Sequence, residues 1–236
     1  MSFLVVLVAG QLSSQQRQNA AQMVDEGSFG IFMQGKRIGT ERFQIQQTND
    51  VGILTASLTV DDGKNRAEQH SEMQITANGA LRRYTWSSTL PQAEQSVVEP
   101  ANGFLTEHDT TADLKKHDMP YILPPSTVIL DDSFFSHREL LVWRYFATGC
   151  TPKGNQLDCG PSQFGILVPR QHTAGTATVE LLGREKITLQ SRQWELNKLK
   201  MNIDGVECWL WVSNPENHYR VMKISIPSAG AEVLRD

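Results

Sequence analysis

Long apolar runs are missing from this sequence. No stretch reaches the roughly 18 consecutive apolar residues that an ordinary transmembrane helix needs. Basic clusters are also scarce, since none is longer than those in "LRR" and "LKK", and the formal net charge is -4. A general nucleic-acid binder normally carries a basic face, so this class is excluded as a first interpretation.

Local catalytic and metal-binding motifs are missing as well. The chain has no Gly-x-Ser-x-Gly elbow, no Gly-Lys-Ser/Thr phosphate loop and no Gly-x-Gly-x-x-Gly dinucleotide motif. It also has no His-x-His, His-Glu-x-x-His or Cys/His zinc pattern. Paired glycosidase carboxylates stay open, because they meet only in three dimensions. No catalytic residue, cofactor or metal is therefore predicted.

Cysteines are few, three in all. Cys150 and Cys159 flank the turn-rich segment "TPKGNQLD", which favours a disulfide that closes a short loop. Free thiols are the alternative, and a zinc site is disfavoured because no second ligand pair stands at zinc spacing. Cys208 lies in the apolar segment "VECWLWV", where we expect a small buried side chain.

Residues 1–24 resemble a secretory signal followed by a disordered leader. An apolar run from Phe3 to Ala9 precedes a small-residue cleavage pattern at Val8-Ala9-Gly10 and a Gln/Ser-rich stretch. No basic residue precedes the apolar run, and a buried strand is the alternative interpretation. A signal and a disulfide together indicate export, and we predict the periplasm of a Gram-negative-type bacterium.

Residues 25–236 are predicted to form a single β-rich domain. Apolar residues make up 39% of the chain and charged residues 20%, which is enough for a folded core. Most of the sequence alternates with period two between turn signals such as "DDGKN", "ANG" and "IDGV". Several strands are apolar on much of both faces. The predicted fold is mainly β, a strongly curved antiparallel sheet or open β-barrel.

One segment, 132–147, breaks this period and predicts a helix. Its apolar residues recur at helical spacing, and Pro124 and Pro125 keep the preceding segment extended. Asp131 or Asp132 is expected to cap its first turn. The apolar stripe is wide, so we expect this amphipathic helix to pack on the concave side of the sheet.

The segment "ILDDSFFSH" at the start of this helix concentrates chemistry-bearing side chains. A metal site would require Asp131, Asp132 and His137 to converge, yet on a helix that begins at Asp132 the histidine lies about 140° away. We therefore expect a helix cap and a partly buried, hydrogen-bonded histidine. Ligand contact by His137 is one alternative, and catalysis with Asp131, Asp132 or Ser136 is another.

Two charged patches stand near turn signals. They are Glu107-His108-Asp109 and the segment 115–118, "KKHD". Both are interpreted as solvated loops.

The five tryptophans lie in predicted regular elements and suggest an aromatic-lined cavity. Core packing is the alternative interpretation. A cavity between a curved sheet and a covering helix would have the concave, mostly apolar form that is usual for small-molecule sites. The candidate ligand-binding residues are Trp86, Phe134, His137, Leu141, Trp143, Trp209 and Trp211.

Several segments resemble a family of uncharacterised bacterial exported proteins. "GSFGIFMQGKRIGTERFQI" is similar to their opening hairpin, and "VILDDSFFSHRELLVWRY" is similar to their single internal helix. "FGILVPR" and "CWLWVSNPENHYRVMKISIP" look like their closing strands. The resemblance covers roughly residues 28–235. It implies a curved half-barrel like that of bacterial lipoprotein-carrier proteins, and hence lipid or lipoprotein handling.

The sequence thus predicts an exported, non-enzymatic protein that binds an apolar or amphipathic ligand such as a lipid or lipoprotein. Contact with the membrane is expected to be peripheral at most, and no nucleic acid is expected as a partner. One alternative is an envelope assembly module that adds a strand to a partner protein. Another is an envelope hydrolase that uses His137.

Overall fold

The computed structural model describes residues 21–48, 50–154, 156–214 and 218–236. The signal-like segment lies outside these residues up to position 20. The first strand, β1, begins at Gln22, so residues 22–24 of the predicted leader belong to the folded sheet.

Seventeen strands and one α-helix make up the described part of the chain. Fifteen strands form one sheet in the order β8-β7-β6-β5-β4-β3-β2-β1-β17-β16-β15-β14-β13-β12-β9, and β10 and β11 form a separate hairpin. The strands are β1 (Gln22–Met33), β2 (Lys36–Gln47), β3 (Val51–Asp61), β4 (Arg66–Thr76), β5 (Leu81–Leu90), β6 (Glu94–Ala101), β7 (Phe104–Thr110), β8 (Lys116–Tyr121), β9 (Val128–Ile129), β10 (Cys150–Lys153), β11 (Gln156–Cys159), β12 (Ser162–Val168), β13 (Thr173–Leu189), β14 (Arg192–Ile203), β15 (Val206–Ser213), β16 (Arg220–Ile226) and β17 (Ala231–Arg235).

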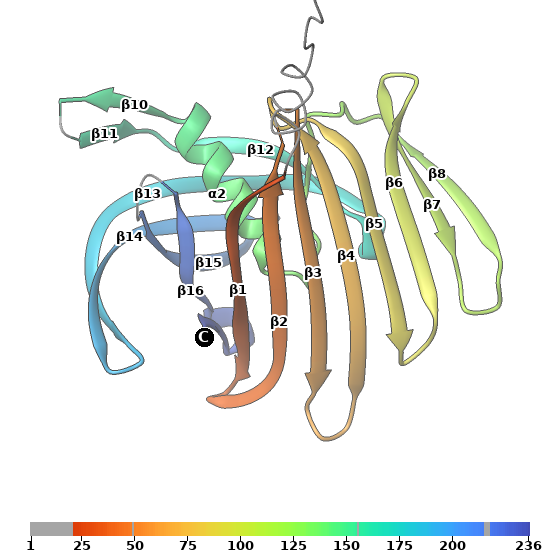
Figure 1. The fold of residues 1–236 in the computed structure, drawn as a ribbon, viewed down its shortest axis with the longest axis horizontal. Helices are drawn as coiled ribbons and strands as arrows, with labels where there is room; N and C mark the ends of the chain where they lie inside the picture. Colours follow the sequence, from red (N-terminus) through yellow and green to blue (C-terminus); the bar gives the residue numbers. More distant parts are fainter. Residues whose placement is uncertain (1–20, 49, 155, 215–217) are drawn as a thin grey trace, which may run out of the picture.

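The large sheet curves around the single helix, α2 (Ser136–Thr148), which lies on its concave side (Figure 1). Neighbouring strands pair antiparallel, except that the two-residue β9 runs parallel to β12. The predicted fold class, a strongly curved antiparallel sheet with one packed helix, is confirmed. In the part of the chain that the structure describes, no helix has the length and apolar character that a membrane crossing needs.

Period-two burial builds the core, as the sequence predicted. In β3, Leu54, Ala56 and Leu58 are buried while the intervening residues are exposed. In β2, Phe43 and Ile45 face inward, and the same register turns the charged Glu41 inward as well. An inward carboxylate must find donors, and it meets them at the start of the helix.

Two of the predicted turns have the backbone conformation that tight hairpins need. Asn102-Gly103 joins β6 to β7, and Asp204-Gly205 joins β14 to β15. All four residues have positive φ, between 46° and 90°, which the favoured two-residue hairpin turns require. Asparagine, aspartate and glycine tolerate this conformation best, so these dipeptides were reliable signals.

Strand β13 is long because it continues through a bulge between Leu181 and Gly183, where Gly183 has φ +120°. Two assignments from the sequence are wrong, because both charged patches that were interpreted as solvated loops lie in strands. Glu107-His108-Asp109 lies within β7, and residues 116–118 of the "KKHD" patch begin the edge strand β8. Both patches were assigned to loops because they are charged. Strand β8 tolerates charge because it is an exposed edge, and β7 tolerates it because the buried Glu107 contacts other polar groups.

The two ends of the described chain meet in the middle of the sheet. β1 pairs with β17, with Phe29 opposite Arg235 and Met33 opposite Ala231. The Arg235 guanidinium donates to both carboxylate oxygens of Asp25 at 2.7 and 2.8 Å, and it lies 3.4 Å from the Glu139 carboxylate of α2. Both carboxylate groups are buried. This buried ion cluster therefore links both end strands to the helix.

Candidate functional site

Helix α2 begins at Ser136, four residues after the predicted start at 132. Neither Asp131 nor Asp132 caps it, so that prediction is wrong. The residue before the helix, Phe135, makes no capping bond with its side chain. Glu41 of β2 replaces the cap, since its two carboxylate oxygens accept the backbone N–H groups of Phe135 at 2.7 Å and Ser136 at 3.1 Å.

The environment of Glu41 has opposing effects on its ionisation. Burial raises the pKa of this carboxyl from 4.5 to about 7, while the hydrogen bonds from Ser136 and Phe135 act in the opposite direction. Hydrogen bonds to free N–H groups at a helix start favour the negative charge. The group thus titrates near neutral pH and anchors the helix to the sheet.

Asp131 organises the turn that precedes the helix. Its carboxylate accepts the backbone N–H of Ser133 at 3.0 Å and the hydroxyl of Tyr84 at 2.7 Å. Burial raises the pKa of Asp131 to about 6. This carboxylate therefore fixes the loop against strand β5 rather than capping the helix.

His137 is hydrogen-bonded, as expected, but it is fully rather than partly buried. Its Nδ1 accepts the backbone N–H of Asp131 at 3.2 Å. Burial, with a further contribution from the charge of Arg138, lowers the pKa of the imidazole to about 3. The ring therefore stays neutral at ordinary pH. Because Nδ1 accepts the N–H of Asp131, the proton of the neutral ring lies on Nε2.

Three of the predicted ligand-binding residues are core. Phe134, His137 and Leu141 are each 0% exposed, and the rings of Phe134 and His137 stack with centroids 5.5 Å apart. They fix the helix on the sheet and do not form an accessible wall.

A hollow of about 490 Å³ opens on the other side of the helix. We call it the helix–sheet hollow. It lies between one face of α2 and the neighbouring ends of β1, β2, β3 and β4, and its volume is within the range of small-molecule sites. Its lining is Val24, Ile45, Gln46, Gln47, Gly52, Ile53, Leu54, Ile75, Thr76, Ala77, Asn78, Gly79, Leu140, Trp143, Arg144, Ala147 and Thr148.

The helix contributes a regular stripe to this lining. Leu140, Trp143, Arg144 and Ala147 follow the spacing i, i+3, i+4, i+7 and so share one helical face. Of the predicted residues, only Trp143 lies here. The helical spacing of these four residues was visible in the sequence. The ligand-binding residues of the helix were nevertheless chosen mainly from the wide apolar stripe on its other face.

Arg144 provides the positive charge of the helix–sheet hollow. Its guanidinium donates to the backbone carbonyl of Ser126 at 2.6 Å and lies over the ring of Phe164. No carboxylate within salt-bridge distance of Arg144 occurs among the described residues. The indole N–H of Trp143 is already bonded to the carbonyl of Tyr219. The hollow is thus mainly apolar with a single guanidinium at its wall.

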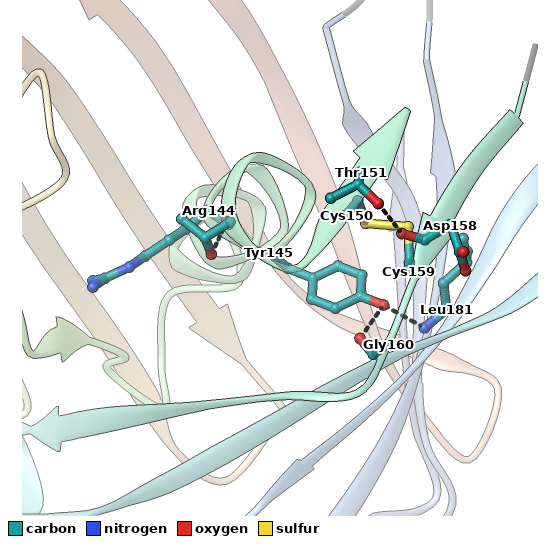
Figure 2. Close-up of a disulfide and its surroundings, with 9 residues drawn as sticks. Arg144, Tyr145, Cys150, Thr151, Asp158, Cys159, Gly160 and Leu181 are labelled. Carbon is teal, nitrogen blue, oxygen red and sulfur yellow. Dashed lines mark hydrogen bonds between the residues drawn. A yellow bond between two sulfur atoms is a disulfide. The ribbon is translucent and has the colours of Figure 1, made fainter. Parts of the chain in front are cut away.

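The C-terminal end of α2 is fixed beside a disulfide (Figure 2). Cys150 and Cys159 are bonded, as predicted, and they face each other across the β10–β11 hairpin. The Tyr145 hydroxyl donates to the carbonyl of Gly160 at 3.1 Å and accepts the N–H of Leu181 at 2.9 Å. These contacts hold the end of the helix that borders the helix–sheet hollow.

Removing this disulfide should destabilise the protein measurably. The loop-entropy relation gives a loss of about 2–3 kcal/mol in the free energy of unfolding for a loop of this size. Urea unfolding of the Cys150→Ala/Cys159→Ala variant measures it. Dithiothreitol should lower the stability of the unmodified protein similarly and leave the variant unchanged. Equal sensitivity of both proteins to the reductant would contradict this account.

The remaining tryptophans lie elsewhere. Trp86 donates its indole N–H to Gln69 at 3.3 Å, and the guanidinium of Arg170 stacks over its ring; it borders a separate hollow of about 220 Å³. Trp209 and Trp211 lie on the face of β15 opposite Cys208, which is buried as expected; Trp211 is only 9% exposed, because Lys198 and Lys223 lie over its ring. Trp209 lies beneath the ammonium group of Lys198. The seven predicted residues therefore do not converge on one cavity, because curvature separates the strands that carry them.

The architecture defines the class: a β-barrel-like protein in which one strongly curved antiparallel sheet encloses a single helix. A solved structure with the same fold is the crystal structure of a β-barrel-like protein of domain of unknown function DUF1849 from Brucella abortus. The two share 9% sequence identity with a TM-score of 0.54, and the alignment covers 92% of this chain and 97% of that chain.

At this identity the likeness establishes the fold alone. It supports the expected resemblance to a bacterial β-barrel-like family at that level. No family model matches the sequence, and a comparison with curated proteins finds no match.

Proposed function

We propose that this protein is an exported carrier or binder of an anionic amphiphile, such as the acyl part of a lipid or lipoprotein. The observation that carries the proposal is the helix–sheet hollow, which combines an apolar lining with the guanidinium of Arg144. An acyl chain would bury apolar surface against Leu140 and Trp143. A carboxylate or phosphate head group would meet the arginine, which recognises such groups with two parallel hydrogen bonds.

Other features support a binding role. Small-molecule sites are usually concave and largely preformed, with few polar groups that orient the ligand. The disulfide and the Tyr145 contacts fix the helical wall of the hollow, so little ordering is needed on binding. The predicted signal and the disulfide both favour an exported protein.

Two substitutions test the proposed site. Ala147 is exposed on the lining face of α2, so Ala147→Trp should fill the hollow and weaken binding of a fluorescent fatty acid at least tenfold. Arg144→Met should weaken binding of the fatty acid more than that of the fatty alcohol of equal length, because only the acid carries a charge. Fluorescence titration gives both affinities.

The matched control is Lys153→Trp, which adds the same side chain at an exposed position of β10 outside the lining. It should bind like the unmodified protein. Lipid extraction followed by native mass spectrometry of periplasmic protein would identify the natural ligand. If neither the fatty acid nor an extracted lipid binds, or if Ala147→Trp binds as tightly as the control, the proposal fails.

The alternatives receive less support from the described residues. Strand addition requires a long edge with few charges, but edge strand β8 is short and carries Lys116, Asp118 and Pro120, which discourage pairing. The opposite edge, β9, has two residues. A hydrolase that uses His137 requires an accessible imidazole, whereas this side chain is fully buried.

A further inference from the structure

The inward face of β7 carries two carboxylates outside the helix–sheet hollow. Leu105, Glu107 and Asp109 alternate on this face. The Glu107 side chain is 0% exposed and that of Asp109 is 12% exposed. A third group, His172, approaches them from the connection between β12 and β13.

The three side chains converge at the spacing of a metal coordination shell. His172 Nδ1 lies 3.3 Å from Glu107 Oε2 and 3.5 Å from Asp109 Oδ2, and all three candidate ligand atoms lie within 4.8 Å of one another. A tetrahedral zinc ion with bonds of about 2.0–2.1 Å places any two ligands about 3.3 Å apart. Two of the observed separations match this value closely.

The surroundings of Glu107 resemble the support that metal ligands usually have. The Ser96 hydroxyl donates to one carboxylate oxygen at 2.8 Å, and the Tyr121 hydroxyl donates to the other at 2.6 Å. Such bonds orient a ligating carboxylate. Both donors are neutral, and among the described residues the only basic group within salt-bridge distance of Glu107 is His172. The Glu107 carboxyl, whose pKa burial raises above its usual range, therefore has no permanent cation beside it among these residues.

The cluster also faces open space. Glu107, Asp109 and His172 line the hollow of about 220 Å³ that Trp86 borders, so a water ligand could complete the shell. We propose that these three residues bind a divalent transition-metal ion, with Zn²⁺ as the best match. A shell with an imidazole nitrogen favours zinc, copper or nickel over Mg²⁺ and Ca²⁺, which prefer oxygen ligands alone.

Isothermal titration of the disulfide-intact protein with ZnCl₂ tests the proposal. We expect one strong equivalent of Zn²⁺, and no comparable binding of MgCl₂ or CaCl₂. His172→Ala and Asp109→Asn should each weaken zinc binding at least tenfold, in line with the loss of one ligand. Both side chains reach the solvent-facing part of the cluster, so these variants should fold, and circular dichroism checks that they do.

The matched control is His108→Ala. His108 neighbours both carboxylates in β7 but points to the opposite face, where it pairs with Asp118 at 2.8 Å. Its loss should leave zinc affinity unchanged. The visible spectrum of the cobalt-substituted protein should show four-coordinate geometry, and His172→Ala should abolish this signature. Absence of a strong zinc equivalent, or equal zinc affinity of His172→Ala and His108→Ala, would overturn the proposal.

Discussion

Arg235→Met is expected to lower the free energy of unfolding by about 3 kcal/mol, near the lower end of what breaking a buried ion pair costs. The guanidinium is 10% exposed and is shared between Asp25 and Glu139. Burial, reinforced by a hydrogen bond and the charge of Asp25, raises the pKa of Glu139 well above its usual range. In the variant, the buried Asp25 carboxylate loses its partner Arg235.

The loss should not exceed this range, because Arg220 also lies 3.0 Å from Asp25. Urea unfolding measures it. Arg37→Met is the control, since Arg37 pairs with Asp236 at 2.7 Å on the surface with side chains 43% and 35% exposed. Such pairs contribute about 1 kcal/mol or less.

Adding Asp25→Asn to Arg235→Met should recover part of the loss, because it removes the buried carboxylate that has lost one of its two guanidinium partners. If Arg235→Met and Arg37→Met destabilise the protein equally, the buried cluster does not hold the ends of the sheet.

Glu41→Ala should cost about 2–4 kcal/mol of stability. The variant leaves the N–H groups of Phe135 and Ser136 without their acceptor, and an unsatisfied buried group costs about 1–3 kcal/mol. Glu41→Gln keeps one carbonyl acceptor and should therefore lose less. Thermal and urea unfolding of both variants provide the comparison, and equal losses would show that the hydrogen bonds are not what matters.

A comparison of the unmodified protein with Glu41→Gln also predicts a pH dependence of the stability. The pKa of Glu41 rises from 4.5 to about 7 on folding, so its stabilising contribution is complete below 4.5 and declines as pH rises through 7. Glu41→Gln cannot titrate. The stability advantage of the unmodified protein over Glu41→Gln should therefore shrink between pH 5 and pH 8, by up to about 3 kcal/mol.

Other groups, such as His137, titrate alike in both proteins and cancel in this difference. An advantage that grew with pH would mean that the helix start keeps Glu41 ionised throughout.

Local patterns were enough to predict the strands, most turns, the helix and the disulfide. Alternation placed Leu54 and Phe43 inward, and Asn102-Gly103 specified its own turn. The start of the helix was not predictable in this way. Its acceptor, Glu41, lies 94 residues before Phe135, so only the folded sheet brings the two together.

The candidate sites were less predictable for the same reason. The helix–sheet hollow is made by the ends of four strands, and no local window contains them. Searching for aromatic residues selected Trp209 and Trp211, which strand alternation places on the face of β15 opposite the buried Cys208. Glu107 was interpreted as a solvated charge. It stands two residues after the buried Leu105, so strand alternation predicts that its side chain faces inward, and this spacing was visible in the sequence.

The pairing of β1 with β17 has a consequence for the order of folding. Every other neighbouring pair in the long sheet, apart from the β9–β12 contact, joins strands that follow each other along the chain. Arg235 and Asp25, by contrast, are 210 residues apart. Closing so long a loop costs more entropy than forming a hairpin, and non-local pairing slows folding. The sheet should therefore assemble as two separate meanders, β1 to β8 and β12 to β17, whose joining at the centre is the late, rate-limiting event.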